Sequence, residues 1–298
     1  MTTRWKLALH TVSYSGSWGQ ESLSLDDALL RARSLGFDGV MLMAKRPHAS
    51  PLDLDADGRR RLRARLDELG LGAPCVAGYN DFALGAGRSD IPALEMGIAY
   101  IAELCRLARD IGSPLVRIFT AFEPSEGSHG SLWRTVVSGL KEAARRARDL
   151  GVTLAVQNHH DLAVHHLALA DLLAEVDEPG CRAAFDAWAP ALQGADLAAA
   201  VRALAPWIVH TTAADYAPRP RFRYRPDLVQ YAAEPAEMRM VPFGEGIVDY
   251  PAFFGALEEV GYGGWVGFEM CAPLLGGGSG ENLDRQARRF KESLERRD

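Results

Sequence analysis

The chain has 298 residues, of which 48% are hydrophobic, 24% charged and 8% aromatic, proportions that exclude a disordered, coiled-coil or collagen-like chain. Lys and Arg number 33 against 39 Asp and Glu, which gives a net charge of −6. This mildly acidic balance argues against a nucleic-acid partner, which requires a basic face, and it gives no indication of binding to an anionic membrane surface.

The N-terminal segment and the cysteines indicate the compartment. The first residues, MTTRWKLALHTVSYSG, lack the long apolar stretch of a signal peptide. No apolar run approaches the length of a membrane span. The cysteines form no CxxC pair, so we expect reduced, mostly buried thiols and a cytoplasmic protein. The four are Cys75, Cys105, Cys181 and Cys271.

A repeated unit organises the chain: a helix-like stretch ends at Gly, and a short apolar run follows. Gly after the last helical turn supplies the left-handed conformation that closes a helix. A nearly continuous apolar run is typical of a strand that is buried on both faces. These units predict eight strands, at about 5–11, 38–44, 73–79, 115–120, 152–157, 182–187, 207–213 and 264–269.

Amphipathic stretches between these runs predict helices. The alternation of strands and helices implies parallel strands, and eight such units in under 300 residues predict a single (β/α)8 TIM barrel that forms one domain over residues 1–298. A doubly wound sheet would need a Gly-rich phosphate loop after the first strand, where HTVSYSG stands instead. The predicted helices begin near residue 24 and continue at about 56–69, 91–111, 131–150, 167–177, 194–205, 251–260 and 280–296.

The longest irregular segment, at about 214–249, is rich in proline, arginine and aromatic residues. It follows the seventh predicted strand, so we expect a long loop on the catalytic face of the barrel. Such a loop could close over a substrate, and its arginines could bind a phosphate or a carboxylate. A solvated arm or a contact between copies of the chain is an equal alternative. The arginines are Arg219, Arg221, Arg223 and Arg225.

Polar residues at the carboxyl ends of the strands mark the predicted site, because barrel enzymes carry their chemistry there. The last four strands in the chain end at or contain Gln157, Asp186, His210 and Glu269. Two carboxylates, an imidazole and an amide oxygen suit one divalent ion such as Mn²⁺, Mg²⁺, Co²⁺ or Zn²⁺. Taken singly, each has an ordinary alternative, such as a helix cap or a structural histidine. Predicted substrate contacts at or near strand ends are His10, Arg117, Trp188 and Asp215.

Four segments carry a resemblance to a known family: VTLAVQNHHD, FDAW, WIVHTTAAD and the thirty-residue run VPFGEGIVDYPAFFGALEEVGYGGWVGFEM. They resemble the xylose isomerase-like barrels, the sugar isomerase/epimerase group. The resemblance implies a (β/α)8 barrel with one divalent metal ion, often Mn²⁺. It also implies ligands of the types Glu, Asp, His and Glu, which match Gln157, Asp186, His210 and Glu269 here.

This sequence departs from the family pattern at the first ligand. The epimerases have a glutamate there, which is a metal ligand and one of two proton-transfer carboxylates, whereas this chain has Gln157. An amide can offer its oxygen to a metal but cannot accept a proton at neutral pH. A second family histidine is replaced by Ala189, an acid after the second strand by the run 41–43, and a second acid after the seventh strand by Ala213.

The resemblance and the residues together predict a metal-dependent enzyme that abstracts a proton next to the carbonyl of a sugar or keto-polyol substrate. Glu269 is the expected base, and His159 or His160 the partner acid or base, because histidine titrates near neutrality. A lyase or dehydratase acting on a keto sugar, and a degenerate barrel that binds sugars without catalysis, remain open. We expect a sugar-like small molecule as partner, no nucleic acid and no membrane, and we leave a homo-oligomer open.

Overall fold

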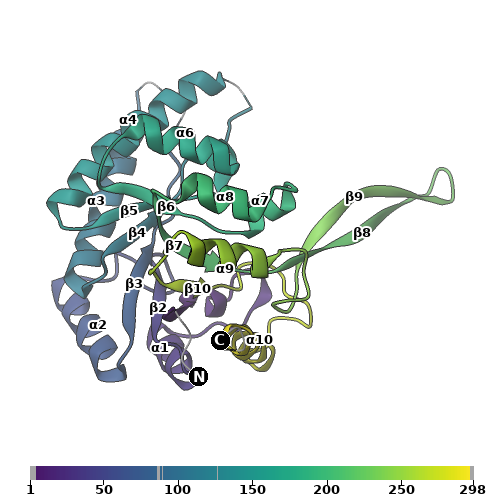
Figure 1. Cartoon of the computed structure of the whole chain (residues 1–298), viewed down its shortest axis with the longest axis horizontal. Coiled ribbons are helices and arrows are strands. Elements are labelled where there is room, and N and C mark those ends of the chain that lie inside the picture. Colours follow the sequence, from purple (N-terminus) through teal and green to yellow (C-terminus); the bar gives the residue numbers. More distant parts are fainter. Residues whose placement is uncertain (1–4, 86–87, 89, 126, 296–298) are drawn as a thin grey trace.

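The computed structural model describes the chain except residues 1–4, 86–87, 89, 126 and 296–298. Eight parallel strands close into a barrel in the order β1-β10-β7-β6-β5-β4-β3-β2 (Figure 1). Each of them overlaps a strand predicted from the sequence, which confirms the single (β/α)8 architecture. The barrel strands are β1 (Leu7–His10), β2 (Gly39–Met43), β3 (Gly72–Ala77), β4 (Leu115–Ile118), β5 (Thr153–Gln157), β6 (Cys181–Ala184), β7 (Ile208–Ala213) and β10 (Val266–Phe268).

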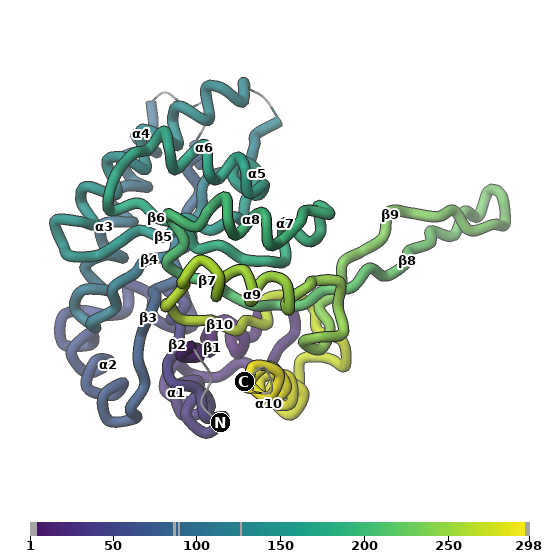
Figure 2. The backbone as a smooth tube through the Cα atoms, in the orientation of Figure 1, coloured from purple at the N-terminus to yellow at the C-terminus, as the bar shows by residue number. Residues whose placement is uncertain are grey.

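Helices surround the barrel and bury their apolar faces against it (Figures 1 and 2). The Gly signals in the sequence act as predicted: α2 and α3 end at Gly70 and Gly112, whose φ angles of 63° and 76° are left-handed. Two short 3-10 helices, η1 (Thr11–Tyr14) and η2 (Ser17–Gly19), follow β1. The α-helices are α1 (Leu25–Ser34), α2 (Ala56–Leu69), α3 (Ala93–Ile111), α4 (His129–Asp149), α5 (His160–Ala163), α6 (His166–Val176), α7 (Trp188–Leu192), α8 (Leu197–Leu204), α9 (Tyr250–Glu259) and α10 (Gly280–Glu295).

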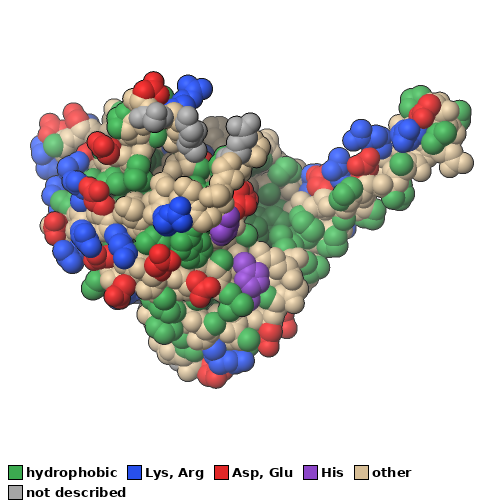
Figure 3. Space-filling view, turned by 90° about the horizontal axis from the view of Figure 1, so that it is seen from above, with side chains coloured by type: hydrophobic (Ala, Val, Ile, Leu, Met, Phe, Trp, Pro, Cys, Tyr) green, Lys and Arg blue, Asp and Glu red, His purple; other side chains and the backbone are tan. Residues whose placement is uncertain are grey.

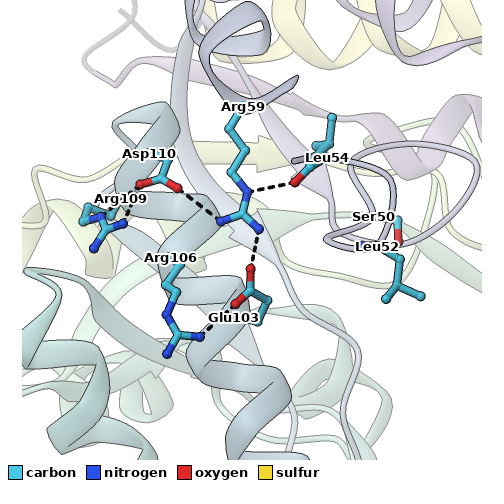
Figure 4. Close-up of polar contacts among 8 residues, drawn as sticks. All are labelled: Ser50, Leu52, Leu54, Arg59, Glu103, Arg106, Arg109 and Asp110. Carbon is cyan, nitrogen blue, oxygen red and sulfur yellow. Dashed lines mark hydrogen bonds and ion pairs between the residues drawn. The ribbon is translucent and has the colours of Figure 1, made fainter. Parts of the chain in front are cut away.

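A buried arginine fixes α2 against α3. Arg59 of α2 donates hydrogen bonds to the carboxylates of Glu103 and Asp110 on α3, the latter at 3.1 Å, and to the backbone oxygen of Leu54 at 3.0 Å (Figure 4). Its side chain is 10% exposed. A guanidinium that is this well hydrogen-bonded offsets the cost of its burial and sets the register of the two helices.

The segment after β7 differs from the expected irregular loop. It forms a two-stranded antiparallel hairpin, β8 (Tyr216–Arg225) and β9 (Gln230–Met240), that projects from the barrel (Figures 1 and 2). We call residues 216–240 the arm. The run YAPRPRFRYR alternates apolar and arginine residues, which is the period of a strand with two different faces. That alternation explains why the segment is a ribbon.

None of the described helices combines the length and apolar character that a membrane span requires.

Candidate functional site

Four neighbouring strands bring the predicted ligand set to the carboxyl end of the barrel. β10, β7, β6 and β5 are adjacent in the closed sheet. Gln157 of β5 pairs in register with Ala184 of β6, which in turn pairs with His210 of β7. Asp186 and Glu269 follow the ends of β6 and β10. All four side chains are buried: Gln157, Asp186, His210 and Glu269.

Asp186 is the most heavily hydrogen-bonded member of the set. Its Oδ1 accepts the backbone N–H of Thr212 at 2.6 Å, and its Oδ2 accepts an N–H of the Gln157 amide. Asn158 accepts the backbone N–H of Asp186 at 2.8 Å and donates to its backbone oxygen at 2.9 Å. These contacts from β5 and β7 hold the carboxylate in one orientation.

Glu269 and Asp186 both lie at the carboxyl end of the barrel interior, which we call the mouth. The Cys271 thiol donates to Glu269 Oε1 at 3.2 Å, and the Tyr216 hydroxyl lies 3.7 Å from the same sulfur. Burial raises the pKa of both carboxyl groups above their ordinary values. The negative charge of Glu269 raises the pKa of Asp186 further. The raised pKa values mean that two ionised carboxylates are unfavourable here without a further positive charge, which a bound cation would supply.

His210 is buried with neither ring nitrogen hydrogen-bonded to any described residue. Burial lowers the pKa of its ring to about 4, so the imidazole is neutral at physiological pH. Gly267 of the neighbouring β10 lies close to the ring, since a Cβ at this position would stand 3.6 Å from Nε2. A buried, neutral and unpartnered imidazole is uncommon outside functional sites.

The resemblance implies a divalent metal ion here, and the side chains can be tested against it. Two buried carboxylates with raised pKa values and an imidazole with free nitrogens have the donor chemistry of such a site. Within the part of the chain that the structure describes, however, no three His, Cys, Asp or Glu side chains form a ready ligand cluster. Gln157 also directs an amide N–H, not its oxygen, at Asp186. The donor types fit a metal, and their positions need local adjustment to hold one.

A cationic and aromatic group lines the opposite side of the mouth. Arg117 of β4 is 2% exposed, donates to the backbone oxygen of Gly78 at 2.7 Å, and has an Nε without a partner among the described residues. Its guanidinium lies 4.1 Å from the Phe119 ring centroid and 5.0 Å from that of Tyr79. The Lys45 ammonium stands 4.0 Å from the Tyr79 ring. Burial and the charge of Arg117 lower the pKa of Lys45.

The other predicted substrate contacts occupy different environments. His10 is buried at the end of β1, where its Nδ1 lies 3.1 Å from the oxygen of Met41, and burial lowers its pKa. Trp188 packs edge-on against His159 with ring centroids 5.6 Å apart, and its Nε1 has no partner among the described residues. Both lie near the predicted ligands.

The carboxylate of Asp215 is hydrogen-bonded to backbone N–H groups. Its carboxylate accepts the N–H groups of Gly244 and Gly246 at 2.9 Å each and of Tyr216 at 3.0 Å. A Cβ at Gly246 would collide with this carboxylate, so glycine is required for the close approach. These bonds give Asp215 the role of fixing the turn between β9 and α9, and they leave it little capacity for a substrate.

The structure distinguishes the two adjacent histidines. His159 accepts the backbone N–H of His160 through Nδ1, and its ring packs 4.8 Å from that of Phe119. His160 stacks on Phe122 with centroids 3.8 Å apart, and its Nδ1 has no partner among the described residues. Burial lowers the pKa of His159 to about 3 and of His160 to about 4. Both rings are therefore neutral at physiological pH.

A large open cavity adjoins this mouth. It has a volume of about 840 Å³ and lies between the ends of β3 and β4 and the start of α3. Its lining is largely apolar and includes the rings of Tyr79, Tyr100, Phe119, Phe122 and His160. Only His160 of the histidine pair lines this cavity.

Several side chains in the mouth were not singled out as site residues by the sequence. Cys271 and Asn158 lie within two residues of a predicted ligand, so proximity along the chain is a usable signal for both. Tyr79 and Lys45 stand at strand ends, but only the folded barrel places them beside Arg117. Tyr216 reaches Cys271 from the base of the arm, and no sequence pattern indicated that contact.

Known proteins with the same fold and related sequences include sugar epimerases. A protein of Escherichia coli K12 named as an L-ribulose-5-phosphate 3-epimerase, SgbU, is 26% identical over 255 residues, which cover 84% of this chain and 85% of that protein. The L-ribulose-5-phosphate 3-epimerase UlaE of Escherichia coli O157:H7 is 24% identical over 84% of this chain and 80% of its own length.

Solved structures agree on the fold. The D-psicose 3-epimerase of Clostridium cellulolyticum H10 superposes with a TM-score of 0.75 at 16% identity, over 97% of this chain and 98% of its own. A Bacillus anthracis protein named as a 3-DHS dehydratase, AsbF, superposes with a TM-score of 0.74 at 20% identity, over 98% and 100% of the two chains. At these identities the likeness establishes the shared fold alone.

The family pattern of the xylose isomerase-like TIM barrels matches residues 29–295, which is most of the chain. The match includes all four strand ends that form the mouth. The chain therefore belongs to the xylose isomerase-like TIM barrel family.

Proposed function

We propose that the protein is a divalent-metal-dependent enzyme that removes a proton from the carbon next to the carbonyl group of a sugar or keto-polyol. The observation that carries this proposal is the meeting of two buried carboxylates, Asp186 and Glu269, with the unpartnered imidazole of His210. The names of the two Escherichia coli relatives support an isomerase or epimerase acting on a sugar.

Glu269 is the base in this proposal. Burial raises the pKa of its carboxyl group, and a carboxylate with a raised pKa accepts a proton from carbon more readily. The Cys271 thiol uses one lone pair of Oε1, so the carboxylate keeps lone pairs on both oxygens for a metal ion and for the substrate proton. General base catalysis of this kind contributes about 10²- to 10⁴-fold to the rate.

Charge stabilisation comes from both sides of the mouth. A divalent ion held by Asp186, His210 and Glu269, with the amide oxygen of Gln157, would supply Lewis-acid polarisation of the substrate carbonyl. From the opposite side, Arg117 offers a buried guanidinium whose Nε is free to bind the developing oxyanion. The positive charge counts for more here than in water, because the surroundings are apolar and aromatic.

The replacement of a family glutamate by Gln157 bears on the type of reaction. Epimerisation removes a proton from one face of a carbon and returns one to the other, which requires two acid–base groups. An amide cannot be the second of these, and the lowered pKa values of His159 and His160 make their rings weak bases. We therefore favour a proton transfer on one face, as in an aldose–ketose isomerisation, with Glu269 taking the proton and returning it to the neighbouring carbon.

The same observation favours a second candidate, a lyase or dehydratase. Elimination needs one base at the carbon next to the carbonyl and room for a departing group on the following carbon. Glu269 supplies the base and passes the captured proton to the departing hydroxyl group, which leaves as water into the cavity that His160 lines. The product identifies the reaction, because isomerisation conserves the mass of the substrate and elimination does not.

Metal analysis of purified variants tests the proposed ligands. We expect Asp186→Asn and His210→Gln to lose most of the bound metal, because each removes a donor from the buried set. Asp149→Asn is a matched control, since its side chain is 73% exposed and lies at the end of α4. Full metal content in folded Asp186→Asn and His210→Gln proteins, verified by circular dichroism, would show that the ligands lie elsewhere.

A further inference from the structure

The arm carries one apolar face and one charged face. Along β8 the even-numbered positions from 216 to 224 are Tyr, Pro, Pro, Phe and Tyr, while Arg occupies every odd-numbered position from 219 to 225. Phe222 and Tyr224 pair across the ribbon with Ala233 and Tyr231 of β9. Because alternate side chains of a strand point to opposite faces, the aromatic residues share one face. Figure 3 shows arginine-rich and hydrophobic sides along the arm.

The apolar face of the arm is exposed in a single copy of the chain. Phe222 is 65% exposed, Tyr231 70% and, at the turn, Val229 76%. A two-stranded ribbon standing alone in water is marginally stable at best, and contiguous exposed aromatic surface marks an interaction site. The arm's own barrel does not cover this face, since the arm points away from it (Figures 1 and 2).

The barrel carries an apolar surface of matching character at the same carboxyl end. Three large side chains at the cavity beside the mouth are well exposed: Leu84 at 73%, Met96 at 61% and Phe122 at 49%. The arm follows β7, whereas the cavity lies at the ends of β3 and β4, on the opposite side of the closed barrel. Ten extended residues span about 33 Å, and the arm's outward direction places this reach beyond its own barrel.

The net charges of the arm and of the whole chain favour a second copy of this chain as the partner that binds the arm. The arm holds five arginines against three acidic residues, although the chain as a whole has a net charge of −6. The arginines lie on the face opposite the aromatic one, and three of them pair with acidic residues of the arm itself. The net positive charge of the arm therefore steers it toward the acidic remainder of another copy, and the aromatic face makes the contact. Locally, Asp81 and Arg88 line the cavity, and Glu95 and Glu123 directly adjoin two of its lining residues in the sequence, so acidic residues outnumber basic ones there.

We propose that two copies of this chain pair by exchanging arms, each arm laying its aromatic face, Phe222, Tyr224 and Tyr231, into the other's cavity beside the mouth. Two-fold symmetry satisfies both arms and both cavities at once, which is the commonest closed arrangement of a homo-oligomer. The arm of one copy then closes the open side of the aromatic cavity that His160 of the other copy lines. This pairing is independent of the reaction proposed above.

Analytical ultracentrifugation of the full chain tests the pairing. We expect wild-type dimers at micromolar concentration, and we expect Phe222→Ser/Tyr231→Ser to raise the dissociation constant about a hundredfold or more, because both residues are central aromatic anchors. Met96→Ser/Phe122→Ser should weaken the dimer comparably from the cavity side. Leu52→Ser/Leu167→Ser is the control and should remain dimeric, since both leucines are exposed elsewhere, at 86% and 54%.

Cross-linking tests the partner surface. We expect Val229→Cys/Met96→Cys to form a covalent dimer with a short bismaleimide, and neither single variant to do so. A monomeric wild type, or arm variants that dimerise as well as the wild type, would overturn the proposal. Cross-linking of Val229→Cys alone would also overturn it, because the arms would then be pairing with each other.

Discussion

Gln157 occupies the position at which a glutamate is expected from the family resemblance, and its surroundings suggest how it can be tested. Its amide donates to Asp186, whose pKa is already raised by burial and by Glu269. Gln157→Glu would replace that donor by a third negative charge. We expect the metal-free variant to lose about 1–3 kcal/mol of unfolding free energy, the usual cost of a buried polar group left unsatisfied.

Metal should reverse this loss, because a third carboxylate binds a cation more tightly. The measurement is thermal unfolding of Gln157→Glu with and without Mn²⁺, with Gln193→Glu as a control on the exposed surface.

The proposal for Gln157 also predicts that the variant slows the native reaction or redirects it toward epimerisation. A faster native reaction with an unchanged product would mean that Gln157 is only a weaker form of the ordinary ligand.

The buried histidines make stability depend on pH in a direction that can be worked out. Burial lowers the pKa of His159 to about 3, below the ordinary value of 6.5. The unfolded chain therefore binds more protons than the folded one between these values, so stability is lost as the pH falls below about 6.5. We expect His159→Asn to lose less stability than the wild type on acidification, because asparagine does not titrate and can still accept the N–H of His160.

Urea unfolding at about pH 5 and about pH 7 measures this difference. His165→Asn is the matched control, because His165 is exposed and also accepts a backbone N–H at a helix start, that of Leu167. It controls for replacing a histidine that caps a helix start at the surface. An equal acid-induced loss in His159→Asn and the wild type would contradict the buried, neutral state of this ring.

The identities of the site residues were more predictable than their roles. Gln157, Asp186, His210 and Glu269 stand at strand ends, and parallel strands bring their ends to one place. Asp215 also follows a strand, yet its carboxylate holds the turn between β9 and α9 through backbone N–H groups. No sequence pattern reports which backbone groups will face a given side chain, so such roles appear only in the folded chain.

At the scale of elements, the side chain of Arg59 makes the ion pairs between α2 and α3. Arg59 is buried and bonded to Glu103 and Asp110, each of which keeps a second arginine partner when Arg59 is removed (Figure 4). We expect Arg59→Ala to destabilise the protein by about 2 kcal/mol, through the loss of hydrogen bonds between charged groups and of buried side-chain packing. Arg60→Ala, which breaks an exposed pair with Asp57 one position along, should cost less than about 1 kcal/mol.

Urea unfolding of the two variants compares them directly. Similar losses of unfolding free energy for Arg59→Ala and Arg60→Ala would mean that burial adds nothing to the ion pairs of Arg59. The sequence predicts a helix at about 56–69, but a helical period cannot show which of its several arginines turns toward a neighbouring helix.

The arm shows why one element was mispredicted. Its many prolines and arginines suggested an irregular loop, since composition usually separates loops from strands. The alternation in β8 was the better signal, and Pro218 and Pro220 are compatible with it because a ribbon with two edges leaves N–H groups unpaired. In this segment the alternation of residue types was a better guide to the structure than the amino-acid composition.

For the molecule as a whole, the barrel follows from repetition. Eight strand–helix units with Gly at helix ends have few ways to bury their apolar strands, and the closed parallel sheet satisfies all of them. Closure places the carboxylates and His210 on one side of the mouth and Arg117 on the other. This opposition of charges across the barrel cannot be read from the order of residues along the chain.

Hydrogen exchange at carbon tests the central claim most directly, namely that Glu269 removes a proton next to a substrate carbonyl. The metal-loaded enzyme is incubated in D₂O with a panel of keto sugars and their phosphates, and deuterium incorporation and product mass are followed by NMR and mass spectrometry. We expect deuterium or a proton-loss product from the preferred substrate, and at least about a hundredfold less with Glu269→Gln. Glu281→Gln, at a 91% exposed side chain, should match the wild type. Equal turnover by Glu269→Gln and the wild type, or no exchange and no product with any member of the panel, would contradict the account.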